Sequence, residues 1–167
     1  MIIFANMIQR IQHIYFFLIA LIAIWFSVIN ICSFSLENIS AQFKNIYATH
    51  VEITSNTAPL ITEEYNGMLV SLILIALVSF VNIFMFKNRK LQEKIGYINY
   101  IAITAFIVLF IMKFLDNTDM TMFSTSSLTT SSWVNFALMF GMLFLNFLAI
   151  NGIKADEELV RAADRIR

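Results

Sequence analysis

Four long runs of apolar residues, separated by polar segments, dominate the pattern of this chain. The runs cover about residues 11–31, 67–86, 96–113 and 133–151, and their interiors hold no Asp, Glu, Lys or Arg. Since an α-helix rises 1.5 Å per residue, a run of about 20 residues crosses a hydrocarbon core about 30 Å thick. The pattern predicts an all-α membrane protein, a bundle of four transmembrane helices in one domain covering residues 1–167.

The first run admits a second interpretation, as a secretory signal peptide. Arg10 precedes it, and Ser33-Phe34-Ser35 follows it as a small-x-small triplet of the kind found at cleavage sites. The run is longer than the usual core of a signal peptide, however, and Trp25 and Phe26 are residue types that anchor a span at a membrane interface. We therefore expect an uncleaved span.

The distribution of Lys and Arg orients the four spans. Of the eleven cations, Lys44 and Lys113 fall on one side and nine on the other. The nine are Arg10, Lys87, Arg89, Lys90, Lys94, Lys154, Arg161, Arg165 and Arg167. Because cytoplasmic segments carry the excess of cations, both termini and the connector 87–95 are predicted to be cytoplasmic. The expected location is the bacterial inner membrane.

The two outer segments are 32–66 and 114–132. In the first, Ile46–Thr54 is rich in β-branched and aromatic residues, Ser55-Asn56-Thr57 supplies turn residues, and Pro59 precedes Leu60-Ile61-Thr62. This favours a small β-hairpin folded over the bundle, with a simple coil as the alternative. The second segment is dominated by Ser and Thr, which is typical of a solvated link.

The cytoplasmic tail, residues 152–167, is expected to form a short amphipathic helix after a bend or exit at Asn151-Gly152. Leu159, Ala163 and Ile166 lie on one side of that helix. This side is too small to hold the helix in a membrane alone. We expect it to lie against the cytoplasmic ends of the bundle or a partner; a solvated tail is the alternative.

Composition excludes several classes of function. The chain is 59% hydrophobic and 13% charged, against about 25% charged in soluble domains. Its zero net charge gives no basic surface for nucleic acid. Cys32 is the only cysteine, and His50 with Glu52 gives only two ligands on one strand. We expect no disulfide, no metal and no cofactor, and because no acid, base or nucleophile is embedded, no enzyme.

Asparagines are the polar groups embedded in the spans, chiefly Asn82, Asn99, Asn135 and Asn146. They are expected to form hydrogen bonds between helices, each contributing about 0.6 kcal/mol; the alternative is a polar path through the bundle. Our leading hypothesis is a non-enzymatic accessory or assembly protein that contacts a partner through its outer loop or C-terminal helix. The alternative is a small transporter or channel subunit. The lipid bilayer is the expected surrounding, and a membrane protein or a second copy is the expected partner.

Three segments of the chain resemble one family, domain of unknown function 4293, small four-span membrane proteins of Bacteroidota. They are Met7-Ile8-Gln9-Arg10-Ile11-Gln12, Asn88-Arg89-Lys90-Leu91-Gln92 and Asp156–Arg167. The resemblance implies the same topology and origin, and it implies no activity or catalytic residue. Since members of the family typically begin at the equivalent of Met7, translation from Met7 is expected to give the same inserted protein.

Overall fold

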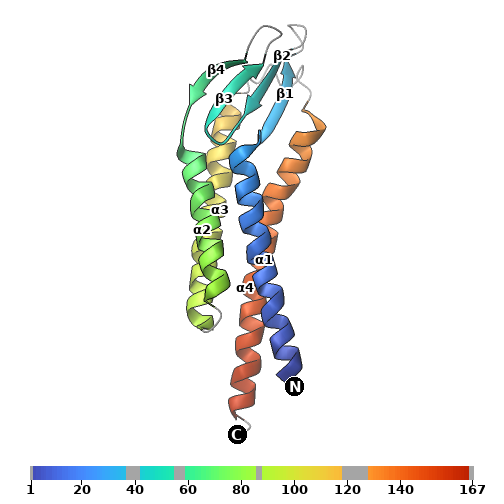
Figure 1. The fold of residues 1–167 in the computed structure, drawn as a ribbon, viewed down its shortest axis with the longest axis vertical. Coiled ribbons are helices and arrows are strands. Elements are labelled where there is room, and N and C mark those ends of the chain that lie inside the picture. Colours follow the sequence, from blue (N-terminus) through green and yellow to red (C-terminus); the bar gives the residue numbers. More distant parts are fainter. Residues whose placement is uncertain (1, 37–41, 55–58, 86–87, 118–127, 166–167) are drawn as a thin grey trace.

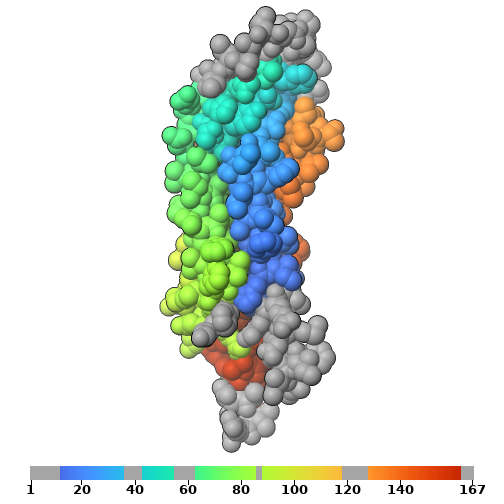
Figure 2. All heavy atoms as spheres, viewed as in Figure 1, coloured from blue at the N-terminus to red at the C-terminus, as the bar shows by residue number. Residues whose placement is uncertain are grey.

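The computed structural model describes residues 2–36, 42–54, 59–85, 88–117 and 128–165 of the chain (Figure 1). Four helices form a bundle, and each contacts two neighbours: α1 and α3 both pack against α2 and α4. The helices are α1 (Ile2–Val28), α2 (Gly67–Phe84), α3 (Arg89–Asn117) and α4 (Thr130–Arg165). Figure 2 shows the coloured part of α1 packed side by side with α2.

Length and composition of the helices match a membrane protein. Within the described residues, three stretches are long and apolar enough to cross a membrane: Gly67–Phe84, Arg89–Asn117 and Thr130–Ala162. The described part of α1 adds the shorter apolar stretch Gln12–Val28. Large apolar side chains cover the outside of the bundle, among them Ile24, Leu77, Phe80, Ile101, Phe140 and Phe144. An outer surface of this kind suits contact with lipid and would be unusual in water.

A small antiparallel sheet lies across one end of the bundle, which we call the sheet end (Figure 1). Its strands follow one another in chain order: β1 (Cys32–Leu36), β2 (Gln42–Ile46), β3 (His50–Thr54) and β4 (Pro59–Glu64). The expected hairpin is confirmed as β3 and β4, and the coil alternative is wrong. The all-α class is corrected to mostly helical with a four-stranded sheet, since β1 and β2 were not expected.

The sheet is fixed to the helices by apolar packing and by backbone contacts. Phe34, Ile46 and Val51 are buried residues of strands β1, β2 and β3. The Phe34 ring packs edge-on against Phe114 of α3, with 6.4 Å between the ring centroids. Along the outer side of β1, the Thr129 N–H donates to the Ser33 carbonyl at 3.1 Å. This contact ties the edge strand to the segment that leads into α4, so the sheet and the bundle share one core.

Two helices extend beyond the expected spans. Helix α3 begins at Arg89, so most of the connector 87–95 is helical; Asn88 caps it, its side-chain oxygen accepting from the Leu91 N–H at 3.3 Å. Helix α4 continues through Asn151 and Gly152, so no bend separates the tail from the fourth span. A Cβ on Gly152 would lie 3.0 Å from Cγ of Gln12, which explains glycine there as a close approach of α1 and α4.

Candidate functional site

The most concentrated group of buried polar side chains lies between α2, α3 and α4, and we call it the polar seam. Its members are all at most 2% exposed: Ser79 and Asn82 of α2, Gln92 and Asn99 of α3, and Asn146 of α4. The spacing of three residues in α2 and seven in α3 places the members of each helix on one face. In a bundle surrounded by lipid, such groups stay inside only where they find partners.

Asn99 is the centre of the seam. Its amide nitrogen donates to Oγ of Ser79 at 3.0 Å and to Oδ1 of Asn146 at 3.2 Å. The amide of Asn146 donates in turn to the carbonyl of Gly96 at 3.1 Å. One asparagine therefore joins α3 to both α2 and α4.

Asn82 and Gln92 form the second part of the seam, nearer the α2–α3 turn. With its amide oriented so that each atom meets a partner, Asn82 donates to the Gln92 carbonyl at 3.0 Å and accepts from the Gly96 N–H at 3.3 Å. The Gln92 amide donates to the Asn82 carbonyl at 3.2 Å. A Cβ on Gly96 would lie 3.0 Å from Cγ1 of Ile150, so glycine lets α3 and α4 approach closely here.

Asn135 lies apart from the seam, at the sheet end of α4. Its amide donates to the carbonyls of Asn30 and Ile31, both at 3.0 Å. Asn135 and Asn146 thus both face inward from α4, but they hold different neighbours: the chain leaving α1 in one case and α3 in the other. Each of the four asparagines forms a hydrogen bond with another element of the fold.

The opposite end of the bundle carries ion pairs between α3 and α4. Arg89 Nε lies 3.0 Å from a carboxylate oxygen of Asp156, which is 1% exposed, and Lys154 lies 3.7 Å from Glu93. Lys90 and Lys94 are exposed nearby, and Arg161 pairs with Glu157 at 2.6 Å. The side chains of Arg10, Lys87, Arg165 and Arg167 lie outside the described residues. Lys44 and Lys113, by contrast, contact Asn117 and Glu63 at the sheet end.

Gln92 and Asp156 were missed as buried polar residues, although the sequence carries a signal for each. Gln92 precedes Asn99 by seven residues, which is two helical turns on the same face. Asp156 continues the buried stripe of Ala149 and Ile153 at spacings of four and three. Because a bend was expected at Gly152, the buried stripe was not extended to Asp156.

The sheet holds the remaining candidate residues. His50 stacks on Tyr47 with ring centroids 4.5 Å apart, and its Nε2 lies 3.9 Å from Glu52. Among the described residues, no three metal-ligating side chains come together. Burial raises the pKa of the Cys32 thiol to about 11, against a smaller opposing effect of a hydrogen bond with Ser132, so the thiol is a poor nucleophile.

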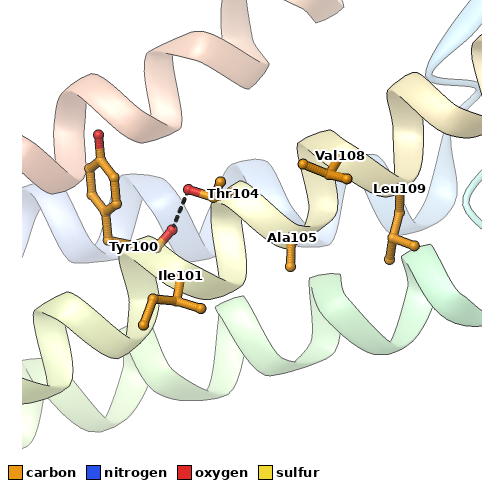
Figure 3. A pocket seen from close by; sticks show the side chains of 6 residues that line it. All are labelled: Tyr100, Ile101, Thr104, Ala105, Val108 and Leu109. Carbon is orange, nitrogen blue, oxygen red and sulfur yellow. Dashed lines mark hydrogen bonds between the residues drawn. The ribbon is translucent and has the colours of Figure 1, made fainter.

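Two hollows on the outer surface of the bundle are lined by described residues. One runs along α3 and is lined by Tyr100, Ile101, Thr104, Ala105, Val108 and Leu109, all from that helix (Figure 3). Its Thr104 hydroxyl already donates to the Tyr100 carbonyl at 2.9 Å. The other lies between α1 and α4 near the sheet, and its polar lining residues are Asn30, Ser131 and Asn135.

The family model described as Domain of unknown function (DUF4293) matches residues 8–166, nearly the whole chain. No curated protein gives a significant match.

Proposed function

The chain belongs to the DUF4293 family, and we propose that it is a four-span protein of the bacterial inner membrane with both termini in the cytoplasm. In this proposal it acts without catalysis, as an accessory or assembly protein. Its partner docks on the end of α4 that projects beyond the α2–α3 turn, which we call the α4 tip (residues 157–162) (Figure 1).

Insertion of all four helices is supported by the outer surface and by length. Helix α1 has 27 residues, which at 1.5 Å per residue is about 40 Å, and its described part exposes Ile14, Phe17 and Leu21. The same type of surface covers the three longer spans. In the sequence, nine cations fall in the terminal and connector segments and two in the outer segments, which supports a periplasmic sheet and a cytoplasmic α4 tip.

The observation that carries the docking proposal is the pair of apolar residues on the α4 tip. Leu159 is 43% exposed and Val160 is 38% exposed, beside the charged Arg161. Leu159 is thus exposed, and of the two expectations for this side of the helix, packing on the bundle or docking on a partner, we retain docking on a partner. The side chains of Ala163 and Ile166 lie outside the described residues.

The α4 tip is held in a fixed direction by the ion pairs immediately before it. Asp156 is buried against Arg89, and Lys154 reaches Glu93. A preorganised helix end loses little conformational freedom when a partner binds, and this favours affinity. The alternative of a transporter or channel subunit has less support, since the amides of Asn99 and Asn146 bond to each other and to neighbouring helices.

The test is co-purification in mild detergent, followed by mass spectrometry of the bound proteins. A Leu159→Glu/Val160→Glu double variant should lose a defined partner, because each change places a charge on the contact surface. The control is Leu91→Glu, which alters a residue of similar exposure, 38%, at the start of α3. Loss of the same proteins in both variants, or retention in both, would refute docking at the α4 tip.

A further inference from the structure

The hollow between α1 and α4 at the sheet end, which we call the α1–α4 groove, is formed by two helices that diverge. Figure 1 shows the sheet end of α4 leaning away from α1. The groove has a volume of about 450 Å³, within the range of about 300–1,000 Å³ found for small-molecule sites. Its lining includes Trp25, Ile29, Asn30, Ser131, Val134 and Leu138.

Hydrogen bonds across its floor hold the groove open at a fixed width. The Asn135 amide joins α4 to the carbonyls of Asn30 and Ile31. One turn earlier, Oγ of Ser132 accepts from the Ser33 N–H at 2.8 Å and donates to the Ser33 carbonyl at 2.9 Å. The bonds of Asn135 to Ile31 and of Ser132 to Ser33 are buried, so the separation of the two helices here is part of the fold.

The lining changes from polar to apolar along the helices. Asn30 and the exposed Ser131 lie at the sheet end, and Val134 and Leu138 follow one and two turns deeper. Asn135 also lines the groove beside Val134, but its amide already donates to the carbonyls of Asn30 and Ile31. Trp25, 54% exposed, supplies the opposite wall from α1. From Ser131 to Leu138 is seven residues, or about 10 Å, which is less than half of a hydrocarbon core about 30 Å thick. The groove therefore has the polarity and depth of the upper part of one lipid leaflet.

We propose that the α1–α4 groove binds one glycerophospholipid of the leaflet on the sheet side. An acyl chain lies between Trp25 and Val134, and the headgroup or ester region meets Ser131 at the sheet end. An amphiphile is the occupant that matches a groove with a polar mouth and mainly apolar walls beyond it. The proposal rests on the membrane insertion proposed above and is independent of the partner on the α4 tip.

The test compares two matched substitutions in the full-length protein. Val134→Phe fills the α1–α4 groove, and Val108→Phe places the same ring in the hollow on α3; the two valines are 55% and 49% exposed. Purified protein in mild detergent is titrated with palmitoyl-oleoyl phosphatidylethanolamine, and bound lipid is counted by native mass spectrometry. We expect one tightly held lipid per chain, affinity reduced about tenfold or more by Val134→Phe, and no such change from Val108→Phe.

A second measurement locates the lipid. The chain has two tryptophans, so a Trp133→Phe variant leaves Trp25 as the only one. A dibrominated form of the same lipid should quench Trp25 fluorescence and saturate at one equivalent, and adding Val134→Phe should remove the saturable part.

Three results would overturn the lipid site: no retained lipid on the wild type, equal weakening by both valine variants, or quenching that rises without saturation. A dimer mass in place of the lipid adduct would identify a second copy as the occupant and would also overturn it. Extraction of the protein from membranes by alkaline carbonate would instead contradict insertion itself, and this separates the two failures.

Discussion

Replacing Asn146 by Leu should weaken the bundle without unfolding it. Asn146 makes two hydrogen bonds in the polar seam, donating to the Gly96 carbonyl at 3.1 Å and accepting from Asn99 at 3.2 Å. Leucine has a side chain of similar length but is apolar, so it makes neither bond. Asn99 retains its bond to Ser79, so the change leaves that amide with one partner.

The expected decrease in the free energy of unfolding follows from the loss of these two hydrogen bonds. Hydrogen bonds between membrane helices contribute about 0.6 kcal/mol each on average and about 1.7 kcal/mol at most. Two bonds give a decrease in the free energy of unfolding of about 1.2 kcal/mol, which is about sevenfold in the ratio of folded to unfolded protein. The upper limit from the same range is about 3.4 kcal/mol.

The assay is reversible unfolding of the purified protein in mixed micelles of increasing SDS fraction, followed by circular dichroism. The control is Asn151→Leu, the same substitution at an exposed position of α4, which should change the free energy of unfolding by less than about 0.5 kcal/mol. An Asn146→Leu variant as stable as the wild type would refute the role of the seam. So would solute flux in liposomes that this variant abolishes while its stability is unchanged.

Three further changes have defined outcomes. Gly96→Leu should lower the free energy of unfolding by about 1–3 kcal/mol through overpacking, whereas Gly141→Leu should not, because nothing lies within 4 Å of a Cβ there; SDS titration measures both. Arg89→Gln removes a partner of a buried carboxylate and should cost about 3 kcal/mol, against less than about 1 kcal/mol for Lys154→Gln, whose side chain is 46% exposed. Native Cys32, with its pKa near 11, should react with iodoacetamide far more slowly at pH 8 than after denaturation in SDS; equal rates would contradict its burial.

Long uninterrupted patterns made the helices and one hairpin predictable. Uncharged apolar runs locate the spans, and the alternation around Val51 and Ile53 locates β3. Strand β1 was not predicted because it follows the first apolar run directly. Ile31, Cys32 and Phe34 therefore look like the end of that run, and the alternation with Ser33 gives no distinct strand signal. Strand β2 has only Phe43 and Ile46 as large apolar residues, too few for a period-two signal.

Pairing between helices could not be predicted, because periodicity fixes the face of a residue and leaves its partner open. The asparagines were expected to face inward, and they do, but the contact of Asn99 with Asn146 depends on the relative height of α3 and α4. The Asn151-Gly152 dipeptide is a turn signal that packing overrides, since the glycine lets α4 pass Gln12 of α1. Because α4 continues past Gly152 without a bend, Asp156 reaches Arg89 of α3, 67 positions away in the sequence.

The proposed topology and docking site both require that the sheet end and the α4 tip face opposite sides of the membrane. Two single-cysteine variants, with Cys32 replaced by alanine, test this: Glu64→Cys at the exposed end of β4 and Glu158→Cys on the α4 tip. A membrane-impermeant maleimide is applied to intact spheroplasts and, separately, to permeabilised ones. We predict that Glu64→Cys is labelled in intact spheroplasts and that Glu158→Cys is labelled only after permeabilisation. Labelling of Glu158→Cys in intact spheroplasts, or protection of Glu64→Cys there, would contradict the proposed topology.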